Sequence, residues 1–542
     1  MNAQKGKLGK SAIIWLAAII STIVCVAALL IWLLSSFNIV GGRLYDKDEY
    51  FVIDGTAYSN AEYFELDGKA YDFATYFEID GVAYDYESSF EFEGASYPRS
   101  EYFTAGDRLY DYATYFCLND TAYAHADYFL LSDTAYDRAE WFEHDGAAYR
   151  HSEHYVAHDR LYEIKEITLG GKTFMSDVTE LELRDCGITD ISVLADCGKL
   201  EKLDLGSEWE SVSNLNRIED ISALSELYGL KYLDLSANKI SDASPISGLI
   251  NLEHLNLELN RLASIEPLAG LINVTYLDIS DNYWTIMDEN FNYKVLYDHF
   301  SDITPLSGMT KLTHLDISDN PLFNAADKRN CLEPLSGLTE LTWLDVSAIC
   351  FYWGYENEVH LDISPLAELV NLTVLNVSSN WEVDGASALS YLTGLVHLDL
   401  CKTQINDASH LSGLTELVYL DITSTGITDL SPLSELTRLE ALLADSNLAF
   451  VDGTYGAMLY ISDVSPLAGM KNLRYLAINE GQAKDYSPLY ALDKLEYLSV
   501  SHRIGEDQLI ALRAALPGCK ILCGFDDIDI REQITGIPTL EQ

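Results

Sequence analysis

Three patterns of apolar and polar positions follow one another along the chain. Residues 12–34 form an almost continuous apolar run. Residues 41–165 repeat a tyrosine-rich phrase every 13 residues, and from about Val178 leucines recur in Leu-x-x-Leu-x-Leu steps every 22 residues. The apolar run predicts a long helix, the alternating phrase predicts strand pairs, and the leucine steps predict short strands that bury one face.

The apolar run near the amino terminus is long enough to cross a membrane. As a helix, Ala12 to Leu34 would span about 35 Å. Three lysines and no acid precede it, and positive charges stay on the cytoplasmic side. We therefore expect a short cytoplasmic tail over residues 1–10, an uncleaved transmembrane signal anchor over residues 11–40, and the C-terminal bulk outside the cell membrane. A cleaved signal peptide, whose apolar stretch is shorter, is the alternative.

The 13-residue phrase over residues 41–165 keeps its aromatic residues in phase. Tyrosine recurs every 13 residues from Tyr45 to Tyr162, and a second aromatic, mostly phenylalanine, follows six residues after most of them. In the copy YFEIDGVAY, the Asp-Gly pair favours a type I′ turn, because both central residues of that turn need positive φ. Phe77 would then pair with Tyr84, and Ile79 with Val82, on one face of a hairpin.

A lone hairpin is not stable in water, so consecutive copies are predicted to stack and bury their apolar faces. The resulting array has two candidate roles. Its rings form a row of platforms for a glycan or peptide, or they hold together a spacer. The constant phase of the aromatic residues favours the spacer, because packing requires the same residue type at the same place in every copy.

The 22-residue pattern reads Leu-x-x-Leu-x-Leu-x-x-Asn-x-Ile/Leu. Its leucines are predicted to point inward from a short strand, and its asparagine amides are predicted to bond the backbone between coils. Thirteen copies start at Val178, Leu200, Leu230, Leu252, Val274, Leu312, Leu341, Leu372, Leu395, Leu417, Leu439, Leu473 and Leu495. The turn asparagines are Asn238, Asn260, Asn282, Asn320 and Asn380.

Prolines recur in the outer phrase of the same repeat, for which Ser-Pro-Leu-Ala-Gly-Leu is typical. Proline suits the first turn of a short helix. The eight prolines at this place are Pro245, Pro267, Pro305, Pro334, Pro365, Pro432, Pro466 and Pro488.

Over residues 178–522 this pattern resembles the 22-residue leucine-rich repeats of internalin-like bacterial surface proteins. The resemblance implies a curved solenoid with a parallel sheet on its concave face and short helical or 3-10 turns on its convex face. It also implies a ligand that is most often a protein. We assign residues 166–523 to this leucine-rich repeat domain, including a terminal cap near Leu512 to Leu522, and residues 524–542 to a loosely held C-terminal tail.

Positions 3 and 5 of each repeat point outward from the predicted strand. Position 3 is aromatic or imidazole: Tyr232, His254, Tyr276, His314, Trp343, His397, Tyr419, Tyr475 and Tyr497. Position 5 is mostly acidic: Asp234, Asp278, Asp316, Asp345, Asp399 and Asp421, with Asp204, Asn256 and Asn376. Rings beside fixed carboxylates suit a cationic or amphipathic protein partner. The inserted loops over residues 283–300 and 350–360 are a second candidate surface, and sheet packing alone is the alternative explanation of both rows.

Charge and cysteine content narrow the partners further. The formal charge is −51, so nucleic acid and anionic lipid headgroups are repelled. The nine cysteines are scattered without the spacing of a metal site. Cys186 with Cys197, and Cys519 with Cys523, are candidate disulfides at the two ends of the solenoid.

The sequence contains none of the common catalytic or nucleotide-binding motifs, and its carboxylates recur with the repeat. We therefore expect no enzyme, no catalytic residue, no cofactor and no metal. The predicted function is that of a membrane-anchored extracytoplasmic scaffold that binds a protein partner. The alternative is adhesion to cell-wall glycan through the tyrosine-rich repeats, with the solenoid as support. Self-association of the repeats is a third, structural alternative.

Overall fold

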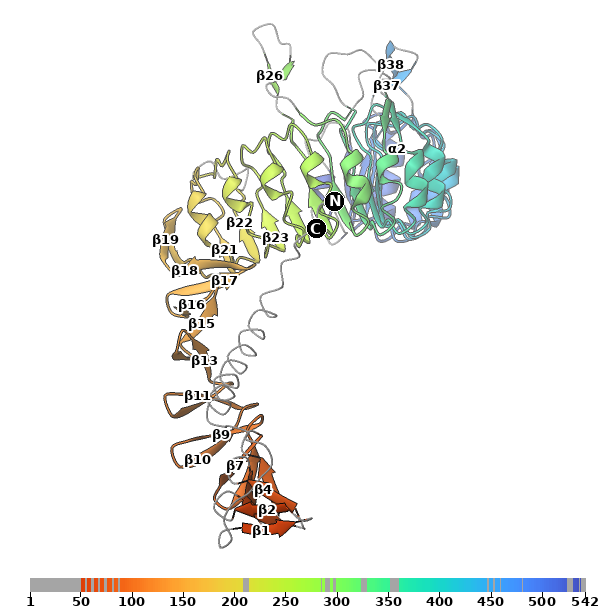
Figure 1. The fold of residues 1–542 in the computed structure, drawn as a ribbon. Helices are drawn as coiled ribbons and strands as arrows, with labels where there is room; N and C mark the ends of the chain where they lie inside the picture. Colours follow the sequence, from red (N-terminus) through yellow and green to blue (C-terminus); the bar gives the residue numbers. More distant parts are fainter. Residues whose placement is uncertain are drawn as a thin grey trace, which may run out of the picture. The chain divides into compact units, whose positions relative to one another are not determined.

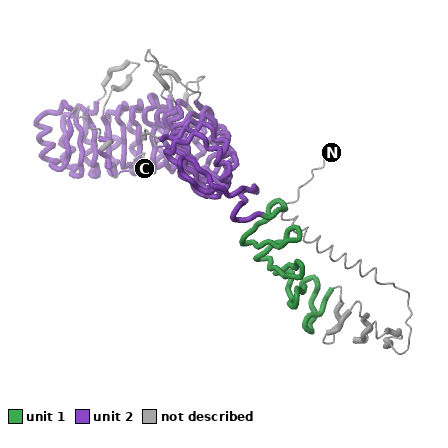
Figure 2. Tube along the Cα trace, turned by 90° about the vertical axis from the view of Figure 1, so that its left-hand side faces the viewer, with its two compact units in different colours: residues 1–148 green, residues 149–542 purple. Residues whose placement is uncertain are grey.

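The computed structural model describes most of the chain beyond residue 49. The described residues are 50–53, 56–59, 63–66, 69–72, 76–79, 82–85, 88–207, 214–283, 285–287, 293–295, 299–322, 329–350, 360–445, 448–451, 454–458, 460–479, 481–523, 530–535 and 537. The predicted cytoplasmic tail (1–10) and membrane anchor (11–40) lie outside them. Within these ranges, no helix has both the length and the apolar character that a membrane crossing requires. The chain divides into two compact units, residues 1–148 and 149–542 (Figure 2).

The 13-residue phrase forms consecutive antiparallel hairpins, and the boundary between the two units falls within β16. The predicted register is confirmed, since Phe77 lies opposite Tyr84 and Ile79 opposite Val82. The hairpin strands are β1 (Tyr50–Ile53), β2 (Thr56–Ser59), β3 (Tyr63–Leu66), β4 (Lys69–Asp72), β5 (Tyr76–Ile79), β6 (Val82–Asp85), β7 (Ser89–Phe92), β8 (Ala95–Pro98), β9 (Tyr102–Ala105), β10 (Arg108–Asp111), β11 (Tyr115–Leu118), β12 (Thr121–Ala124), β13 (Tyr128–Leu131), β14 (Thr134–Asp137), β15 (Trp141–His144), β16 (Ala147–Arg150), β17 (His154–Ala157), β18 (Arg160–Glu163), β19 (Glu166–Leu169) and β20 (Lys172–Met175).

The turns of these hairpins have the predicted conformation. Asn119 and Asp120 have φ of 47° and 59°, and Asp145 and Gly146 have φ of 48° and 78°. Positive φ at both central residues defines the type I′ turn, which matches the twist of the flanking strands. Asn, Asp and Gly tolerate this conformation better than other residues, so the turn chemistry of the sequence dictates the hairpin.

From β8 onward, aromatic rings connect neighbouring hairpins of the first unit. Phe103 is buried and stacks on Tyr110 across its own hairpin at 5.6 Å. Tyr110 then meets Tyr115 of the following hairpin edge to face at 5.0 Å. A backbone hydrogen bond from Tyr112 N to Glu101 O, 2.7 Å long, closes the base of the first of these two hairpins. The rings that recur every 13 residues therefore pack the array together.

The 22-residue repeats form one 14-stranded parallel sheet. All thirteen predicted repeats contribute a strand, which confirms the repeat assignment. The fourteenth strand, β41, follows helix α2 (Glu506–Ala515) within the predicted cap. In sheet order the strands are β21 (Glu180–Glu182), β22 (Lys202–Asp204), β23 (Tyr232–Asp234), β24 (His254–Asn256), β25 (Tyr276–Asp278), β28 (His314–Asp316), β30 (Trp343–Asp345), β32 (Val374–Asn376), β34 (His397–Asp399), β35 (Tyr419–Asp421), β36 (Ala441–Leu443), β39 (Tyr475–Ile478), β40 (Tyr497–Val500) and β41 (Lys520–Cys523).

Short 3-10 turns cover the side of the solenoid opposite the sheet, and the repeats curve around the sheet side (Figure 1). All eight predicted prolines lie in such turns, and each turn buries a leucine or an isoleucine. The turns are η1 (Ser192–Asp196), η2 (Ser222–Leu224), η3 (Ser244–Ile246), η4 (Glu266–Leu268), η5 (Thr304–Gly308), η6 (Glu333–Leu335), η7 (Ser364–Glu368), η8 (Ala386–Tyr391), η9 (Ala408–Leu411), η10 (Ser431–Leu433), η11 (Ser465–Gly469) and η12 (Ser487–Ala491). We call the solvent-facing side of the 14-stranded sheet the concave face.

Insertions between repeats form small sheets of their own. Two of them are hairpins that project from the same edge of the solenoid, β26 (Thr285–Met287) with β27 (Tyr293–Val295), and β37 (Leu448–Val451) with β38 (Thr454–Met458) (Figure 1). A third group is a parallel sheet of three strands, β29 (Arg329–Cys331), β31 (His360–Asp362) and β33 (Glu382–Asp384).

Buried asparagines join neighbouring coils, as the sequence predicts. Asn260 is fully buried, and its Nδ2 donates to the carbonyl oxygens of Leu235, Leu257 and Glu258 at 2.9–3.1 Å. Its Oδ1 accepts from Ile240 N at 3.0 Å. Asn216 makes the same kind of bonds to neighbouring coils. The repeat pattern does not identify Asn216, because eight inserted residues displace it from its place in the repeat.

The last two hairpins close the N-terminal end of the solenoid core. Tyr155 stands where earlier copies carry phenylalanine, and its hydroxyl donates to the Asp196 and Ser176 carbonyls and accepts from Gly198 N. Gly198 packs against Tyr162 so closely that a Cβ would lie 2.4 Å from the ring. Only glycine therefore fits there.

The candidate disulfides are not formed. Cys186 and Cys197 are free thiols, and so is Cys519.

Replacing Asn260 by alanine removes four buried hydrogen bonds at once. We expect Asn260→Ala to lower the free energy of unfolding by about 2–3 kcal/mol, because buried backbone groups lose their partners. Asn273 is a matched control, since it also bonds a neighbouring coil but is only half-buried, and its hydrogen bond is exposed. Asn273→Ala should cost less than about 1 kcal/mol in a urea unfolding experiment. Equal losses for the two variants would contradict the role assigned to the buried amides.

Candidate functional site

The position-3 side chains of five consecutive strands form one stack of rings on the concave face. We call Tyr232, His254, Tyr276, His314 and Trp343 the aromatic ladder. Their ring centroids are 4.2, 4.1, 4.2 and 3.8 Å apart in that order, and adjacent ring planes lie within 16° of each other. The parallel register places the rings side by side, because each pairs with its neighbour across strands about 4.8 Å apart. The ladder rings are half-buried, so one edge of each faces solvent.

Beyond Trp343 the row continues as two shorter stacks. Val374 separates the ladder from His397 and Tyr419, whose rings stack at 4.1 Å. Further along, Tyr475 and Tyr497 stack at 5.8 Å. His397, Tyr419 and Tyr475 are buried, in contrast to the ladder. The nine predicted position-3 residues thus lie in one row on the concave face, divided into three stacks. The ladder is the stack in which every ring is only half-buried.

The histidines of the ladder are neutral rings at pH 7. Burial lowers the pKa of His254, and it lowers the pKa of His314 to about 4. Each imidazole lies between two aromatic neighbours. The ladder therefore offers uncharged ring edges and faces rather than positive charge.

A row of carboxylates runs beside the rings. We call the position-5 residues Asp234, Asp278, Asp316, Asp345, Asp399 and Asp421 the acid row. Each has an oxygen that accepts from the backbone N–H two residues later, at 2.8–3.0 Å. In Asp278 and Asp316 the same oxygen also accepts from a serine hydroxyl at 2.6 Å. These bonds fix one oxygen of each carboxyl and leave the other directed to neighbouring groups.

Burial disfavours the charged form of several of these carboxyls. Desolvation raises the pKa of Asp278, Asp316 and Asp345 above the ordinary range. It raises the pKa of Asp399 to about 8, and the adjacent Asp421 carboxylate adds to this shift. The register forces these like charges together, so the acid row favours any cation that can reach it.

Two arginines of the chain already neutralise the ends of the acid row. Arg184 donates from Nε to Asp204 at 3.2 Å and from Nη2 to Asp234. Arg531 donates to Asp421 Oδ2 from Nη2 at 2.6 Å and from Nε at 2.9 Å. Sequence reasoning missed both. Arg184 lies at position 7 of its repeat, where later repeats carry serines such as Ser236 and Ser280. Arg531 is the only cation in residues 524–542.

The middle of the acid row has no such partner among the described residues. Asp278, Asp316 and Asp345 form no ion pair there, although they are flanked by the pairs of Arg184 and Arg531. The second oxygen of Asp345 accepts a hydrogen bond from Asn376 Nδ2 at 2.7 Å. The second oxygens of Asp278 and Asp316 receive no hydrogen bond from the described part of the chain.

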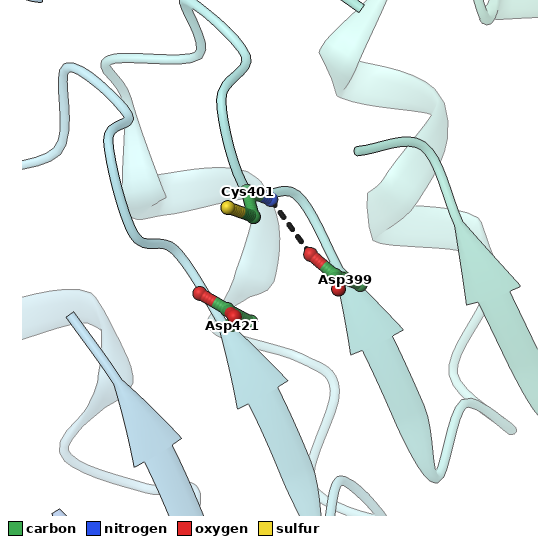
Figure 3. Close-up of side chains that lie close together, drawn as sticks. All are labelled: Asp399, Cys401 and Asp421. Carbon is green, nitrogen blue, oxygen red and sulfur yellow. Dashed lines mark hydrogen bonds between the residues drawn. The ribbon is translucent and has the colours of Figure 1, made fainter. Parts of the chain in front are cut away.

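Asp399, Cys401 and Asp421 form the group most similar to a metal site. Their ligand atoms lie within 4.8 Å of one another (Figure 3). Burial raises the pKa of the Cys401 thiol to about 12, which makes it a poor ligand at neutral pH. The Arg531 guanidinium lies 2.6 Å from Asp421 and 3.4 Å from Cys401 Sγ. The cluster is therefore a site for a guanidinium in this structure.

Arg531 belongs to a part of the C-terminal tail that is held rather than loose. We call residues 530–535 and 537 the C-terminal segment, which includes the 3-10 turn η13 (Arg531–Gln533). Ile530 and Ile537 are buried against residues of β35, β36 and β39 on the concave face. The expectation of a loose tail does not hold for these residues, because it ignored the spaced isoleucines around the arginine.

The inserted loops give less information. Tyr283 contacts His299 edge to face at 5.0 Å, at the base of the hairpin formed by β26 and β27. Most of the second predicted loop, over residues 351–359, lies outside the described residues.

Comparison with known proteins identifies the repeat. The family described as Leucine Rich repeat matches residues 308–324. No curated protein sequence matches the chain. A solved internalin (InlF) from Listeria monocytogenes str. 4b F2365 is 26% identical over 66% of this chain and 90% of that chain, with a TM-score of 0.53. Internalin C2 of the same strain is 29% identical over 47% of this chain and 83% of that chain, with a TM-score of 0.30.

Similarity to solved structures also extends to plants. The leucine-rich repeat ectodomain of the membrane receptor kinase GASSHO1/SCHENGEN3 from Arabidopsis thaliana was solved in complex with CASPARIAN STRIP INTEGRITY FACTOR 2. It is 20% identical over 64% of this chain and 38% of that chain, with a TM-score of 0.47. The likeness to InlF confirms the fold that the 22-residue pattern predicts.

The raised pKa of Asp399 makes stability depend on pH in a definite direction. Its pKa is about 8 in the folded chain against an ordinary value of 3.8, so only the folded state holds this proton between those values. The stabilising contribution is complete below about pH 4 and is lost as pH rises through 8. We expect Asp399→Asn to raise the melting temperature at pH 8 and to raise it much less at pH 5.

Asp485 is the control, because its pKa is lowered by hydrogen bonds from Ser487. Asp485→Asn should not raise the melting temperature at pH 8. Circular dichroism melts of the three proteins at both pH values decide the point. A lower melting temperature for Asp399→Asn at pH 8 would show that this carboxylate stabilises the fold.

Proposed function

Because the chain is a leucine-rich repeat protein with internalin-like structural neighbours, we propose that it is a binding scaffold whose concave face recognises a protein partner. The observation that carries this proposal is the unneutralised middle of the acid row beside the aromatic ladder. Asp278 and Asp316 each keep an oxygen without a donor from the described residues, next to the stacked rings of Tyr276 and His314.

Arginine is the side chain that fits this combination best. Its planar guanidinium stacks on aromatic rings and donates fixed hydrogen bonds to carboxylates, whereas an ammonium does only the second well. The chain itself pairs arginine with carboxylates at both ends of the row, through Arg184 and Arg531. The partner that the middle of the row would accept is therefore a protein segment that presents arginine.

Partner recognition at this site also follows from the energetics of the row. A cation that reaches Asp278 or Asp316 favours the charged form of the carboxyl, which burial disfavours in the free chain by raising the pKa of each. A partner that supplies this cation gains affinity, because it offsets the free-energy cost of burying these two carboxylates without a counter-ion. This argument supports binding over a purely structural role for the acid row.

The membrane location is a further part of the proposal. The apolar run over residues 12–34 and the lysines before it support a single-pass anchor with the solenoid outside the cell. An epitope placed after Gln542 would then be removed by protease added to intact cells. Resistance of the epitope on intact cells, with digestion after lysis, would contradict this orientation.

We assign the hairpin array to spacing rather than to ligand binding. The buried rings of Phe103, Phe116 and Phe129 support this, because a glycan platform needs exposed ring faces. The alternative is adhesion to wall glycan through the array. Retention of the full chain on a peptidoglycan column, unchanged by substitutions on the concave face, would favour that alternative.

Replacing the ladder residue Trp343 tests the proposed surface. Dodecapeptides selected by phage display on the full chain should be enriched in arginine, and Trp343→Ser should weaken their binding about ten-fold or more. Tyr391 is the matched control, because it is an exposed aromatic on the opposite side of the solenoid. Tyr391→Ser should leave the affinity unchanged in isothermal titration calorimetry.

The same peptides should bind more tightly at pH 8 than at pH 5. At pH 5 the raised pKa values keep the acid row more protonated, and a protonated carboxyl attracts a guanidinium less. Peptides without arginine, or an equal loss of affinity in both variants, would contradict the proposed surface.

A further inference from the structure

The C-terminal segment lies on a part of the concave face whose residues depart from the repeat. On β36, positions 3 and 5 are Ala441 and Leu443, and on β39 position 5 is Ala477. On most other strands of the sheet, position 3 carries a ring and position 5 carries a carboxylate. Small and apolar side chains thus replace bulky and charged ones where the segment lies. The apolar positions of β36 and β39 and the C-terminal segment, about 60 to 90 residues later in the chain, therefore form one apolar cluster.

Three isoleucines of the segment cover this apolar area. Ile530 is 4% exposed and Ile537 is 2% exposed, and Ile534 packs against the same cluster. They contact a surface formed by Tyr419, Ala441, Leu443, Tyr475 and Ala477. Without the segment, these apolar side chains would face solvent on an otherwise polar sheet.

The arginine of the segment completes the match by charge. Asp421 has no exposed surface, and Arg531 donates two hydrogen bonds to its Oδ2. A carboxylate buried in this way needs a cation beside it. The surface therefore selects an arginine that has an aliphatic residue immediately before it and others at the third and sixth residues after it.

The segment is held mainly by the side chains of its isoleucines and Arg531, and its backbone makes few hydrogen bonds to the solenoid. Thr535 N donates to Tyr475 Oη at 3.3 Å, and Arg474 Nη1 donates to Thr535 O at 3.2 Å. The parallel sheet ends at β41, and the described residues of the segment add no strand to it. Because no ladder of backbone hydrogen bonds holds the segment, it can leave without disturbing the strands beneath it.

We propose that the C-terminal segment is a ligand held in cis, in a peptide-binding site formed by β35, β36 and β39. A partner that presents arginine with the same spacing of aliphatic residues occupies this site by displacing the segment. The statement about a partner rests on the proposed function, but occupancy of the site by the chain's own segment does not. The site is then masked until the segment leaves, which makes the segment autoinhibitory.

A peptide copy of the segment tests this directly. A fluorescent peptide with the sequence of residues 529–538 is titrated by anisotropy into the full chain and into a full-chain release variant, Arg531→Glu with Ile534→Asp. The release variant should bind the peptide about ten-fold more tightly or better than the unmodified chain, because its own segment no longer competes.

Two controls make the result specific. Arg513→Glu, on the exposed face of α2, should bind the peptide as the unmodified chain does. A peptide with Arg531→Gln should bind the release variant about ten-fold more weakly or worse, because Asp421 loses its cation. Equal affinity for unmodified and release chains, or no binding to a release variant that keeps the unmodified melting temperature, would overturn the proposal.

Hydrogen exchange on the unmodified chain gives a second test, which does not depend on the folding of any variant. The amides of residues 531–535 should exchange well before those of β36 and β39, because the segment opens alone. Equal protection would identify a permanent cap and contradict a displaceable ligand. Trp343→Ser, added to the release variant, should leave peptide binding unchanged, so failure at the ladder and failure at this site remain distinguishable.

Discussion

The parallel register between neighbouring strands is the constraint on which the solenoid depends. It pairs Tyr232 with His254 and Leu233 with Leu255, so residues of the same repeat position become neighbours in space. The same register stacks leucines inside, asparagine amides at the turns, and rings and carboxylates outside. It also brings acids together whether or not their charges are compensated. Burial on this packed face raises the pKa of Asp316 and Asp399, and the like charges that the repeat places beside them raise it further.

How far the sequence predicts the structure follows from the same constraint. The strands, the proline turns and the hairpin register could all be predicted, because each repeats a local signal many times. The unpredicted features occur once. Asn216 follows an insertion, Tyr155 differs from the phenylalanines in its phase by a hydroxyl, and Arg531 acts on Asp421 across 110 residues. No periodic pattern reports a contact of that kind.

For the candidate site, the composition of the two rows was predictable and their division was not. The sequence indicates one row of rings and one of acids along the whole sheet. The structure divides the acid row into neutralised ends and an open middle, because Arg184 and Arg531 reach its ends. Buried like charges without partners are costly, and such departures from good packing are often found at binding surfaces. The open middle beside the ladder is thus the most informative feature of the concave face.

The most direct measurement is a crystal structure of the full chain with a bound arginine-containing dodecapeptide. The account predicts a guanidinium within hydrogen-bonding distance of Asp278 or Asp316, in contact with a ring of the aromatic ladder. A peptide bound to the 3-10 turns or to the inserted hairpins, with the concave face unoccupied between Tyr232 and Trp343, would contradict it.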